Sequence, residues 1–464
     1  MNTIPAICTP QLQLLHRGKV RDSFRVDGAT RLLIVSDRIS AFDRVLETPV
    51  PMKGEVLSRL SNWWFEKTAD MIPNHVIRVV DPAATLVREV EPIRIEMVVR
   101  GYLTGSLGRA YEKGVRTFCG AAVPDGLKPN ARFPQPLVTP TTKEKCDREI
   151  SPAEIVAEGW TTAERYEQMK ATALRLFACG SQVLAEKGLI LVDTKYEFGL
   201  LGDQLMLIDE IHTPDSSRLW DSAAYAHDPL QVEAHDKEYV RAWLRLNRQD
   251  GEYPAALPDD VVRETTRRYL EIYERITGHQ VATTGEDPRT RLARNLYTSG
   301  LIKDGFVAIV MGSKADLEHA AKMKGVIESC GIFVDLRVAS AHKNGEDLVP
   351  LLAGYNRAIE PGAIIAVAGL SNGLGGALAA NSCLPVINCP PFKDAADMLL
   401  NLNSSLMMPS HVPAMTVVKP QEAARAALRA LNLPRLKERF LQDIRKMKDD
   451  LRRDDREVRE VRHA

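Results

Sequence analysis

Hydrophobic and polar positions in the first part of the chain follow short runs separated by turns, a pattern typical of antiparallel strands. Asp27-Gly28 lies between the runs at 16–26 and 30–37, and Gly202-Asp203 divides the stretch 189–220. Both dipeptides favour the tight turns that join two strands of a β-hairpin. The sequence therefore predicts at least two hairpins in this part of the chain.

Apolar residues with helix-like spacing follow in three segments, at 163–186, 235–247 and 258–276. Strands that are followed by segregated helices are typical of an α+β domain. The segment 278–304 is polar and rich in turn-forming residues, with one short helical stretch, and we interpret it as the approach to a linker.

The pattern changes from residue 306 onward. Five apolar runs read as buried strands, namely FVAIVMGS at 306–313, FVDLRVAS at 333–340, AIIAVAG at 363–369, LPVINCPP at 384–391 and AMTVVK at 414–419. Helical patterns separate several of them, notably at 315–329 and 420–431. Strands that alternate with helices predict an α/β domain, with a parallel sheet covered on both faces.

The last thirty residues are highly charged but keep a helical apolar stripe, formed by Leu436, Phe440, Ile444, Met447 and Leu451. We expect a helix that packs on its own domain or on a neighbouring subunit. The predicted organisation has four parts: a first domain at 1–298, a linker at 299–304, a second domain at 305–433 and a charged helix at 434–464.

Composition excludes several classes of protein. The 61 basic and 61 acidic residues give no net charge, and no basic patch or aromatic RNA-binding motif suggests a nucleic-acid partner. No stretch approaches the ~20 apolar residues of a membrane span, and residues 1–18 lack the apolar core of a secretory signal. Seven cysteines, an odd number without CxxC spacing, argue against disulfides or a zinc knuckle. We expect a cytoplasmic protein with no membrane partner.

Acidic and basic side chains interrupt the apolar hairpin at 189–220. Asp193, Lys195 and Glu197 alternate and so project from one face of the first strand, and Asp209 falls opposite Glu197, give or take one residue. Two carboxylates and a lysine suit Mg²⁺ and nucleotide phosphates, because Mg²⁺ prefers oxygen ligands and shares them with phosphate. A surface ladder of salt bridges is the alternative.

Six segments of the first domain resemble the SAICAR synthetase (phosphoribosylaminoimidazole-succinocarboxamide synthase) family, in the family's order, across roughly residues 10–298. They are GKVRDSF at 18–24, SDRISAFD at 36–43, RGYLTGS at 100–106, FPQPLVTPTTK at 133–143, LVDTKYEFG at 191–199 and LIDEIHTPDSSRLW at 207–220. The resemblance implies an ATP-binding α+β domain. It also implies that ATP and Mg²⁺ activate the carboxylate of carboxyaminoimidazole ribotide (CAIR), after which the amine of L-aspartate attacks to give SAICAR.

The same resemblance implies roles for individual residues. Lys19 and Lys195 would contact ATP, Glu197 and Asp209 would hold the metal, and the substrate would be bound by Arg100, Ser106, Asp215 and Arg218. Without the resemblance, structural salt bridges explain the arginines equally well. The chain departs from the family at Cys146-Asp147, where a His-Asp pair is usual.

Three polar loops follow predicted parallel strands in the second domain: MGSKAD at 311–316, SAHK at 340–343 and AGLSNGLGG at 368–376. Open α/β sheets bind ligands at the carboxyl ends of their strands, and the start of a helix there favours phosphate. His342 can move a proton near neutral pH. A lone histidine is more often structural, but three polar loops at one sheet edge favour a catalytic role.

These loops resemble those of the aminoimidazole ribotide (AIR) carboxylase family over roughly 303–433, which implies a flavodoxin-like three-layer fold. SNGLG resembles the form that takes CO₂ directly, without ATP, metal or another cofactor. By resemblance His342 shuttles the proton displaced at the imidazole carbon. Ser313, Asp316, Ser340 and Lys343 would hold the ribose phosphate, and Ser371, Asn372 and Gly373 the CO₂ or new carboxylate. Leu370 and Ala315 depart from the usual arginine and serine.

The sequence therefore predicts a bifunctional enzyme of purine biosynthesis, a lyase and a ligase. The second domain would carboxylate AIR to CAIR, and the first would join CAIR to L-aspartate. By resemblance the carboxylase domain forms homo-oligomers, typically octamers. In the alternative hypothesis the second domain is a non-catalytic oligomerisation module attached to an active synthetase.

Overall fold

The computed structural model describes residues 3–42, 44–144, 147–232, 237–282, 285–371 and 373–461. Cys146 and Asn372 lie outside the described residues. The chain divides into two compact units. The first unit contains the described residues up to Ala6 and Gln13–Leu292, and the second contains Ile7–Leu12 and the described residues from Ala293 onward. The domain limits inferred from the sequence stay predictions.

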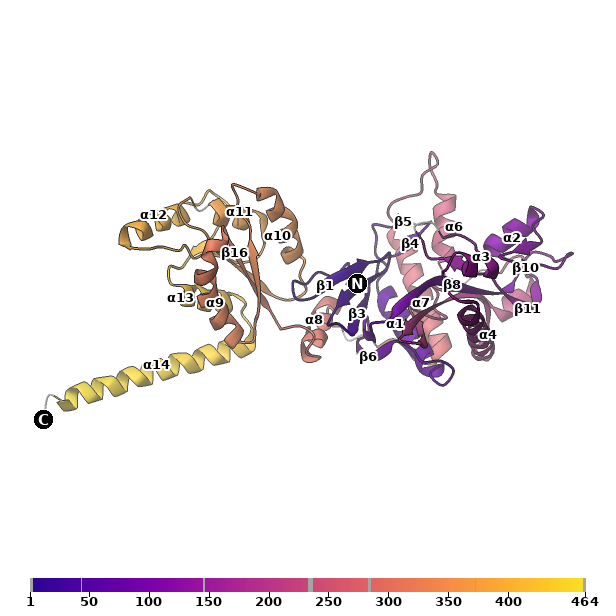
Figure 1. Ribbon diagram of the computed structural model, residues 1–464, viewed down its shortest axis with the longest axis horizontal. Helices are drawn as coiled ribbons and strands as arrows, with labels where there is room; N and C mark the ends of the chain where they lie inside the picture. Colours follow the sequence, from indigo (N-terminus) through magenta and orange to yellow (C-terminus); the bar gives the residue numbers. More distant parts are fainter. Residues whose placement is uncertain are drawn as a thin grey trace. The chain divides into compact units, whose positions relative to one another are not determined.

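Two antiparallel sheets form the framework of the first unit (Figure 1). One has the strand order β1-β2-β3-β7-β6, with β1 (Gln13–Arg17), β2 (Arg21–Arg25), β3 (Thr30–Val35), β7 (Ala84–Arg88) and β6 (Val76–Asp81). The larger has the order β11-β8-β13-β14, with β12 also paired to β8 and β15 to β13. Its strands are β11 (Arg132–Val138), β8 (Glu91–Tyr102), β13 (Leu189–Leu201), β14 (Gln204–Ile208), β12 (Thr141–Thr142) and β15 (Ser217–Asp221). Two short strand pairs are β4 (Ser40–Ala41) with β5 (Arg44–Val45), and β9 (Thr117–Phe118) with β10 (Ala121–Ala122).

Capping residues mark the ends of several helices in the first unit. The helices of this unit are α1 (Lys53–Lys67), α2 (Gly105–Glu112), α3 (Pro152–Ala157), α4 (Ala163–Ala185), α5 (Ser222–His227), α6 (Glu238–Leu246), α7 (Asp259–Thr277) and α8 (Pro288–Thr298), whose last residues belong to the second unit. Thr162 caps α4 by accepting the Arg165 N–H, and Gly278 ends α7 in the left-handed conformation. α1 and α4 bury Trp64 and Leu176 against the larger sheet, where the main core lies.

The β13–β14 hairpin forms about Gly202-Asp203, as the alternation predicts. Glu197 pairs with Ile208, so Asp209 lies one residue beyond the predicted position opposite Glu197, within the expected error. The Asp27-Gly28 turn also joins β2 to β3. The run at 16–26 is not one strand, however, because the chain turns sharply at Gly18, whose N–H donates to the Arg21 carbonyl at 2.8 Å.

The second unit is an α/β fold with a five-stranded parallel sheet. The strand order is β17-β16-β18-β19-β20, with β17 (Phe333–Val338), β16 (Phe306–Met311), β18 (Gly362–Val367), β19 (Val386–Asn388) and β20 (Met415–Thr416). The helices and 3₁₀ turns are η1 (Lys314–Asp316), α9 (Leu317–Ser329), η2 (Gly345–Asp347), α10 (Leu348–Asn356), α11 (Gly373–Asn381), α12 (Ala395–Leu406), α13 (Pro420–Ala430) and α14 (Pro434–Val461). α9 and α13 share one core with the sheet and α10 and α11 another, so both faces are covered (Figure 1). This is the predicted three-layer, flavodoxin-like arrangement.

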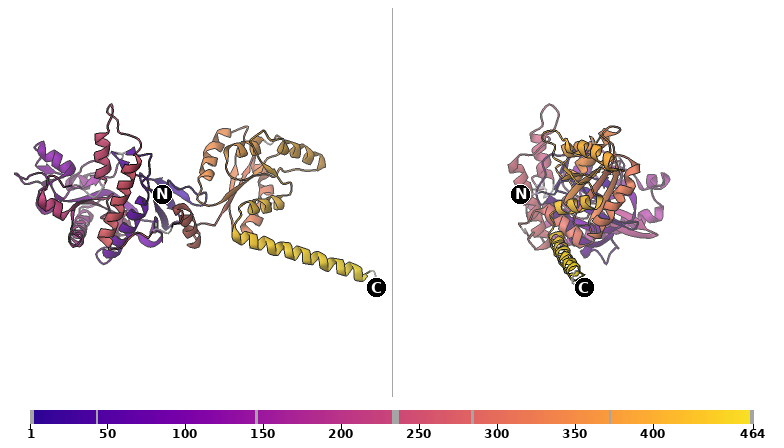
Figure 2. Two further views of the ribbon diagram at one scale, coloured as in Figure 1. Left: turned by 180° about the vertical axis from the view of Figure 1, so that it is seen from behind. Right: turned by 90° about the vertical axis from the view of Figure 1, so that its left-hand side faces the viewer.

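The two ends of the second unit differ in how firmly they are packed. Near its start, Cys8 makes a parallel bridge with Ala358, and the Thr9 hydroxyl donates to Glu360 at 2.5 Å. At the other end, α14 extends away from the sheet (Figure 2). Leu436 is buried, but Leu451 is 62 % exposed, so only the first turns of α14 pack on their own unit. None of the helices in the described ranges is both long and apolar enough to cross a membrane.

Buried His75 makes the stability of the first unit depend on pH. Burial is the main cause that lowers the pKa of His75 from 6.5 to about 4. Between pH 6.5 and 4 the unfolded chain therefore binds a proton that the folded chain does not, and the free energy of unfolding falls as the pH falls.

We expect this histidine to remove about 2 kcal/mol of stability between pH 7 and pH 5. His75→Gln should lessen that loss by the same amount, because glutamine does not titrate. The free energy of unfolding is measured by urea titration, with tryptophan fluorescence as the signal. All five tryptophans lie in the first unit, so the signal reports on that unit. His279→Gln, at an exposed position, is the control and should unfold as the wild type does at both pH values.

Candidate functional site

The face of β13 that carries Asp193, Lys195 and Glu197 is the centre of the site in the first unit. Asp193 lies between two arginines, with Arg100 opposite it on β8 and Arg218 opposite it on β15. An Asp193 oxygen is 3.0 Å from Arg218 Nη1 and 3.5 Å from Arg100 Nη1. The strand register therefore brings both predicted arginines to one carboxylate.

Ser106 and Gly105, at the start of α2, complete this arginine cluster. Arg100 donates to the Ser106 hydroxyl at 3.3 Å and to the Thr139 hydroxyl at 2.8 Å. Gly105 has φ +64, and a Cβ there would lie only 2.8 Å from Arg218 Nη1. Glycine therefore lets the guanidinium approach the start of α2. Beside it, Thr104, Arg218, Arg245 and others line a cavity of about 380 Å³.

Two residues further along the same face, three carboxylates converge on the Lys195 ammonium. Its Nζ is 2.6 Å from Glu197, 2.9 Å from Glu96 and 3.6 Å from Asp209. Lys143, from the segment after β12, also forms an ion pair with Glu197. Glu197 and Asp209 thus reach one common cation, and they do not point to opposite sides of the sheet.

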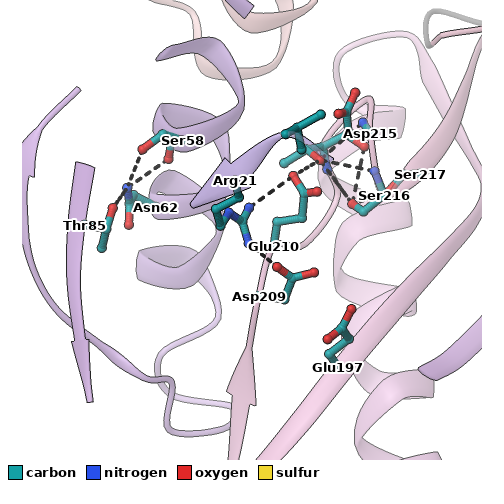
Figure 3. A network of polar contacts seen from close by, with 12 residues as sticks. Arg21, Ser58, Asn62, Thr85, Glu197, Asp209, Glu210, Asp215, Ser216 and Ser217 are labelled. Carbon is teal, nitrogen blue, oxygen red and sulfur yellow. Dashed lines mark hydrogen bonds and ion pairs between the residues drawn. The ribbon is translucent and has the colours of Figure 1, made fainter. Parts of the chain in front are cut away.

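Arg21 holds Asp209 from the other side (Figure 3). Arg21 Nη1 forms an ion pair with Asp209 Oδ1, and Nη2 is 3.7 Å from Glu210 Oε2. Asp209 has φ +66, an unusual conformation for a residue with a side chain. Two consecutive residues, Asp209 and Glu210, thus lie against one guanidinium on β2.

The two predicted metal ligands differ in how readily they ionise. Burial, followed by the charge of Asp209, raises the pKa of Glu197 to about 7, against the pull of Lys195. Burial also opposes ionisation of Asp209, but Arg21 and Lys195 outweigh it and hold the pKa of Asp209 well below its usual range. Carboxylates whose pKa values are driven apart in this way are typical of sites that handle charge.

Asp215 lies in a polar cluster that Thr213 links to Glu210: the Thr213 hydroxyl donates to Glu210 at 2.7 Å and accepts the Asp215 N–H at 3.3 Å. Asp215 Oδ2 is 2.8 Å from Lys53 Nζ and 2.9 Å from Lys237 Nζ, and its Oδ1 accepts the Tyr269 hydroxyl at 2.8 Å. Burial opposes its ionisation, yet the two lysines keep the pKa of Asp215 below its usual range. Both of its oxygens therefore have partners within the protein. Lys19 is exposed, in the turn between β1 and β2.

In the second unit, the predicted residues follow the carboxyl ends of three neighbouring strands. Ser313 and Asp316 follow β16 and cap each other around η1, with the Ser313 N–H donating to Asp316 at 3.2 Å. Ser340 follows β17, and its N–H donates to Asn344 at 2.8 Å. Lys343 is exposed in the same loop. Because β17, β16 and β18 are parallel neighbours, these loops share one edge of the sheet.

His342 and Gly373 meet at this edge. A Cβ on Gly373 would lie 2.9 Å from His342 Nε2, so the imidazole packs directly over the glycine. Leu370, which stands in place of the usual arginine, has φ +60 and is 69 % exposed. Its N–H donates to the side chain of Asn401. Ser371 is exposed beside it, and Ala315 is exposed with its N–H donating to Ser313.

Sequence reasoning did not assign roles to Arg21, Glu96, Lys143 or Lys53. Arg21 and Lys143 lie within recognised motifs, whereas Glu96 and Lys53 lie outside them, and each of the four has its partner far away in the chain. Glu96 is 99 residues from Lys195 and Arg21 is 188 residues from Asp209. No local signal in the sequence pairs these residues, because only the folded arrangement of the strands and of α1 brings each charge to its partner.

Comparisons with known proteins agree with this architecture. The SAICAR synthetase family model matches residues 14–256 and the AIR carboxylase family model matches residues 306–453. The chain is 44 % identical over 274 residues to the phosphoribosylaminoimidazole-succinocarboxamide synthase of Legionella pneumophila (strain Lens), covering 57 % of this chain and 87 % of that protein. It is 42 % identical over 291 residues to the synthase of the same name from Cytophaga hutchinsonii, covering 61 % and 93 %.

A solved structure, SAICAR synthase from Saccharomyces cerevisiae complexed with SAICAR, matches with a TM-score of 0.55 and 33 % identity. It covers 60 % of this chain and all of that chain. The family match spans more than half of the residues and includes the strand face described above. The chain thus belongs to the SAICAR synthetase family, with an AIR carboxylase-like domain in the same polypeptide.

Proposed function

We propose that this chain catalyses two consecutive steps of purine biosynthesis, carboxylation of AIR in the second unit and ATP-dependent ligation of CAIR with L-aspartate in the first. The observation that carries the ligase assignment is the convergence of Glu197 and Asp209 on one cation position, on the strand face that also holds Arg100 and Arg218. Phosphoryl transfer needs positioning and charge neutralisation more than covalent chemistry, and such a face supplies both.

Mg²⁺ fits the donor set of the acid pair. Glu197 and Asp209 offer carboxylate oxygens that already share the Lys195 ammonium, so a divalent cation could bind both. Among the described residues no group of three acids, histidines or cysteines is spaced to hold a metal. Two protein ligands are nevertheless enough for Mg²⁺, which usually keeps waters and shares substrate phosphates. The chemistry that a bound Mg²⁺ supplies is neutralisation of phosphate charge.

The remaining roles in the first unit follow from position. Lys19, exposed at its turn, and Lys195 would contact ATP phosphates. Arg100, Ser106 and Arg218 would bind the ribotide, since guanidinium forks suit phosphate and carboxylate. Asp215 would act indirectly, because its oxygens are engaged by Lys53, Lys237 and Tyr269; its contribution is to position those lysines.

In the second unit, His342 would hold and move the proton displaced at the imidazole carbon, because it packs on Gly373 within the loop proposed for CO₂. Ser313, Asp316, Ser340 and Lys343 would hold the ribose phosphate. Ser371, Gly373 and Asn372, the last outside the described residues, would hold CO₂ or the new carboxylate. By family resemblance the second unit would also mediate homo-oligomerisation.

The exposed Leu370 favours a second candidate, in which the AIR carboxylase-like unit is a non-catalytic assembly module. An arginine at this edge would offer a carboxylate a charged partner that leucine cannot. CO₂-dependent, ATP-independent carboxylation of AIR by the purified full chain decides between the two candidates.

We expect His342→Asn to lower kcat for carboxylation by about 10²–10⁴-fold, the range for loss of a general acid or base. The ligation of CAIR with L-aspartate, assayed in the same preparation, should not change. His411→Asn, at another exposed histidine of the second unit, is the matched control. Carboxylation that survives His342→Asn would remove the histidine from the mechanism, and its absence from the wild type would favour the assembly module.

Glu197→Gln and Asp209→Asn should each raise the Mg²⁺ concentration for half-maximal ligase activity by about tenfold or more, because even loss of an outer partner of a metal ligand weakens metal binding by about 10–100-fold. Titration of ligase activity with Mg²⁺ at saturating ATP measures the effect. Asp203→Asn, in the turn of the same hairpin, should titrate as the wild type does. Unchanged Mg²⁺ dependence in both acid-pair variants would contradict the assignment.

Gly105→Ala should raise KM for CAIR by about tenfold, because a methyl group would collide with the Arg218 guanidinium and displace it by a few tenths of an ångström or more. The substitution also strains a residue at positive φ. Gly114→Ala, at φ +92 with nothing within 4 Å of the added carbon, carries the strain alone and is the control. Equal KM values for the two variants would argue against a role for Arg218 in ribotide binding.

A further inference from the structure

We propose that Arg21 is a positioning residue of the ligase: it orients the Asp209 carboxylate so that one oxygen is held by the protein and the other is presented to the cation position. The inference deepens the proposed function and rests on its cation site. It requires no contact between Arg21 and a substrate.

The two oxygens of Asp209 have different partners. Oδ1 forms the ion pair with Arg21 Nη1, whereas Oδ2 lies 3.6 Å from Lys195 Nζ, on the side of Glu197. In Figure 3 the Arg21 guanidinium lies beside Asp209 and Glu210, with Glu197 on the far side of Asp209. A carboxylate fixed in this way keeps a single oxygen available beside Glu197.

The backbone at Asp209 is shaped for this contact. In an extended strand successive side chains point to opposite faces, so Asp209 and Glu210 would diverge. The left-handed conformation of Asp209, at φ +66, breaks the alternation. Both carboxylates therefore reach one guanidinium, since Glu210 Oε2 lies 3.7 Å from Arg21 Nη2. Aspartate is one of the few residues with a side chain that adopt this conformation readily.

The surroundings of Arg21 keep its guanidinium beside Asp209 and Glu210. The side chain is 16 % exposed and lines a cavity of about 20 Å³ between the smaller sheet and α1. Asp209 is the one acid among the described residues that line this cavity, and Asn62 and Thr85 on its wall bond to each other at 3.0 Å. Arginine suits the position because its planar fork can hold two carboxylates at once, whereas lysine offers a single charged centre.

A direct measurement of Mn²⁺ binding tests the proposal without an activity assay. The electron paramagnetic resonance signal of the free Mn²⁺ ion reports how much metal remains unbound. Arg21→Lys keeps the positive charge but loses the fork, and Arg21→Met loses both. If Arg21 orients Asp209, both variants should bind Mn²⁺ at least tenfold more weakly than the wild type. Arg31→Met is the matched control, since Arg31 makes a bidentate pair with Glu89, the residue directly after the neighbouring strand β7. It should bind as the wild type does.

A purely electrostatic role predicts the opposite result. Removing a positive charge beside a cation site should tighten Mn²⁺ binding in Arg21→Met and leave Arg21→Lys unchanged, and that outcome would overturn the proposal. Wild-type affinity in both variants would overturn it as well.

The variant Glu197→Gln distinguishes an error in the role of Arg21 from an error in the proposed cation site. Loss of Mn²⁺ binding in Glu197→Gln, together with wild-type binding in the Arg21 variants, rejects the role of Arg21 alone. Unchanged binding in Glu197→Gln rejects the cation site, and the Arg21 proposal with it. Arg21→Met removes the guanidinium shared by buried Glu210 and partly buried Asp209, so tryptophan fluorescence must first show native folding. If it does not, Arg21→Lys and the double variant Arg21→Met/Glu210→Gln provide the comparison.

Discussion

The alternation of side chains along β13 is the constraint on which the site in the first unit depends. Every second residue of a strand faces the same side, about 6.6 Å further along. Asp193, Lys195 and Glu197 therefore form an ordered row. Strands β8 and β15 add Arg100 and Arg218 at one end of the row, and the turn to β14 brings Asp209 to the other. A single strand thus sets the spacing between the arginine cluster at Asp193 and the acid pair at Lys195.

The acidic and basic side chains of this row stabilise one another, and no single charge is favourable there without the others. Glu197 and Glu96 are direct cross-strand partners, and like charges in that arrangement repel. The Lys195 ammonium bonds to both and offsets the repulsion. Asp209 and Arg21 extend the same balance to the smaller sheet. Exchange of one cation for another is then easier than removal of a cation, because buried acids without a counter-charge are costly.

Local patterns in the sequence were enough to predict the hairpin about Gly202-Asp203, the row on β13 and the five parallel strands of the second unit, since each depends on residues close together in the chain. The exact position of Asp209 was not predictable, because it depends on a register defined only to one residue and on a left-handed backbone. The contacts of Arg21 with Asp209 and of Asp215 with Lys53 and Tyr269 join residues more than 50 positions apart. No periodicity encodes those pairings, and the turn at Gly18 within an apparent strand arises from a local backbone contact.

In the second unit, the backbone determines where the polar loops lie, and the side chains determine which charges those loops carry. Parallel strands bring the loops of Ser313, Ser340 and Gly373 to one edge whatever their side chains are. Leu370 is held there by its backbone, whose N–H donates to Asn401; the Asn401 amide in turn donates to the Pro391 carbonyl at 3.1 Å. Because the loop is fixed through main-chain contacts, leucine in place of arginine removes a charge without removing the support of the loop. The contact of His342 with Gly373 is likewise independent of residue 370. The fold therefore assembles this edge of the sheet with either residue at position 370, and under the proposed function the substitution bears on the charge offered to a carboxylate, not on the shape of the loop.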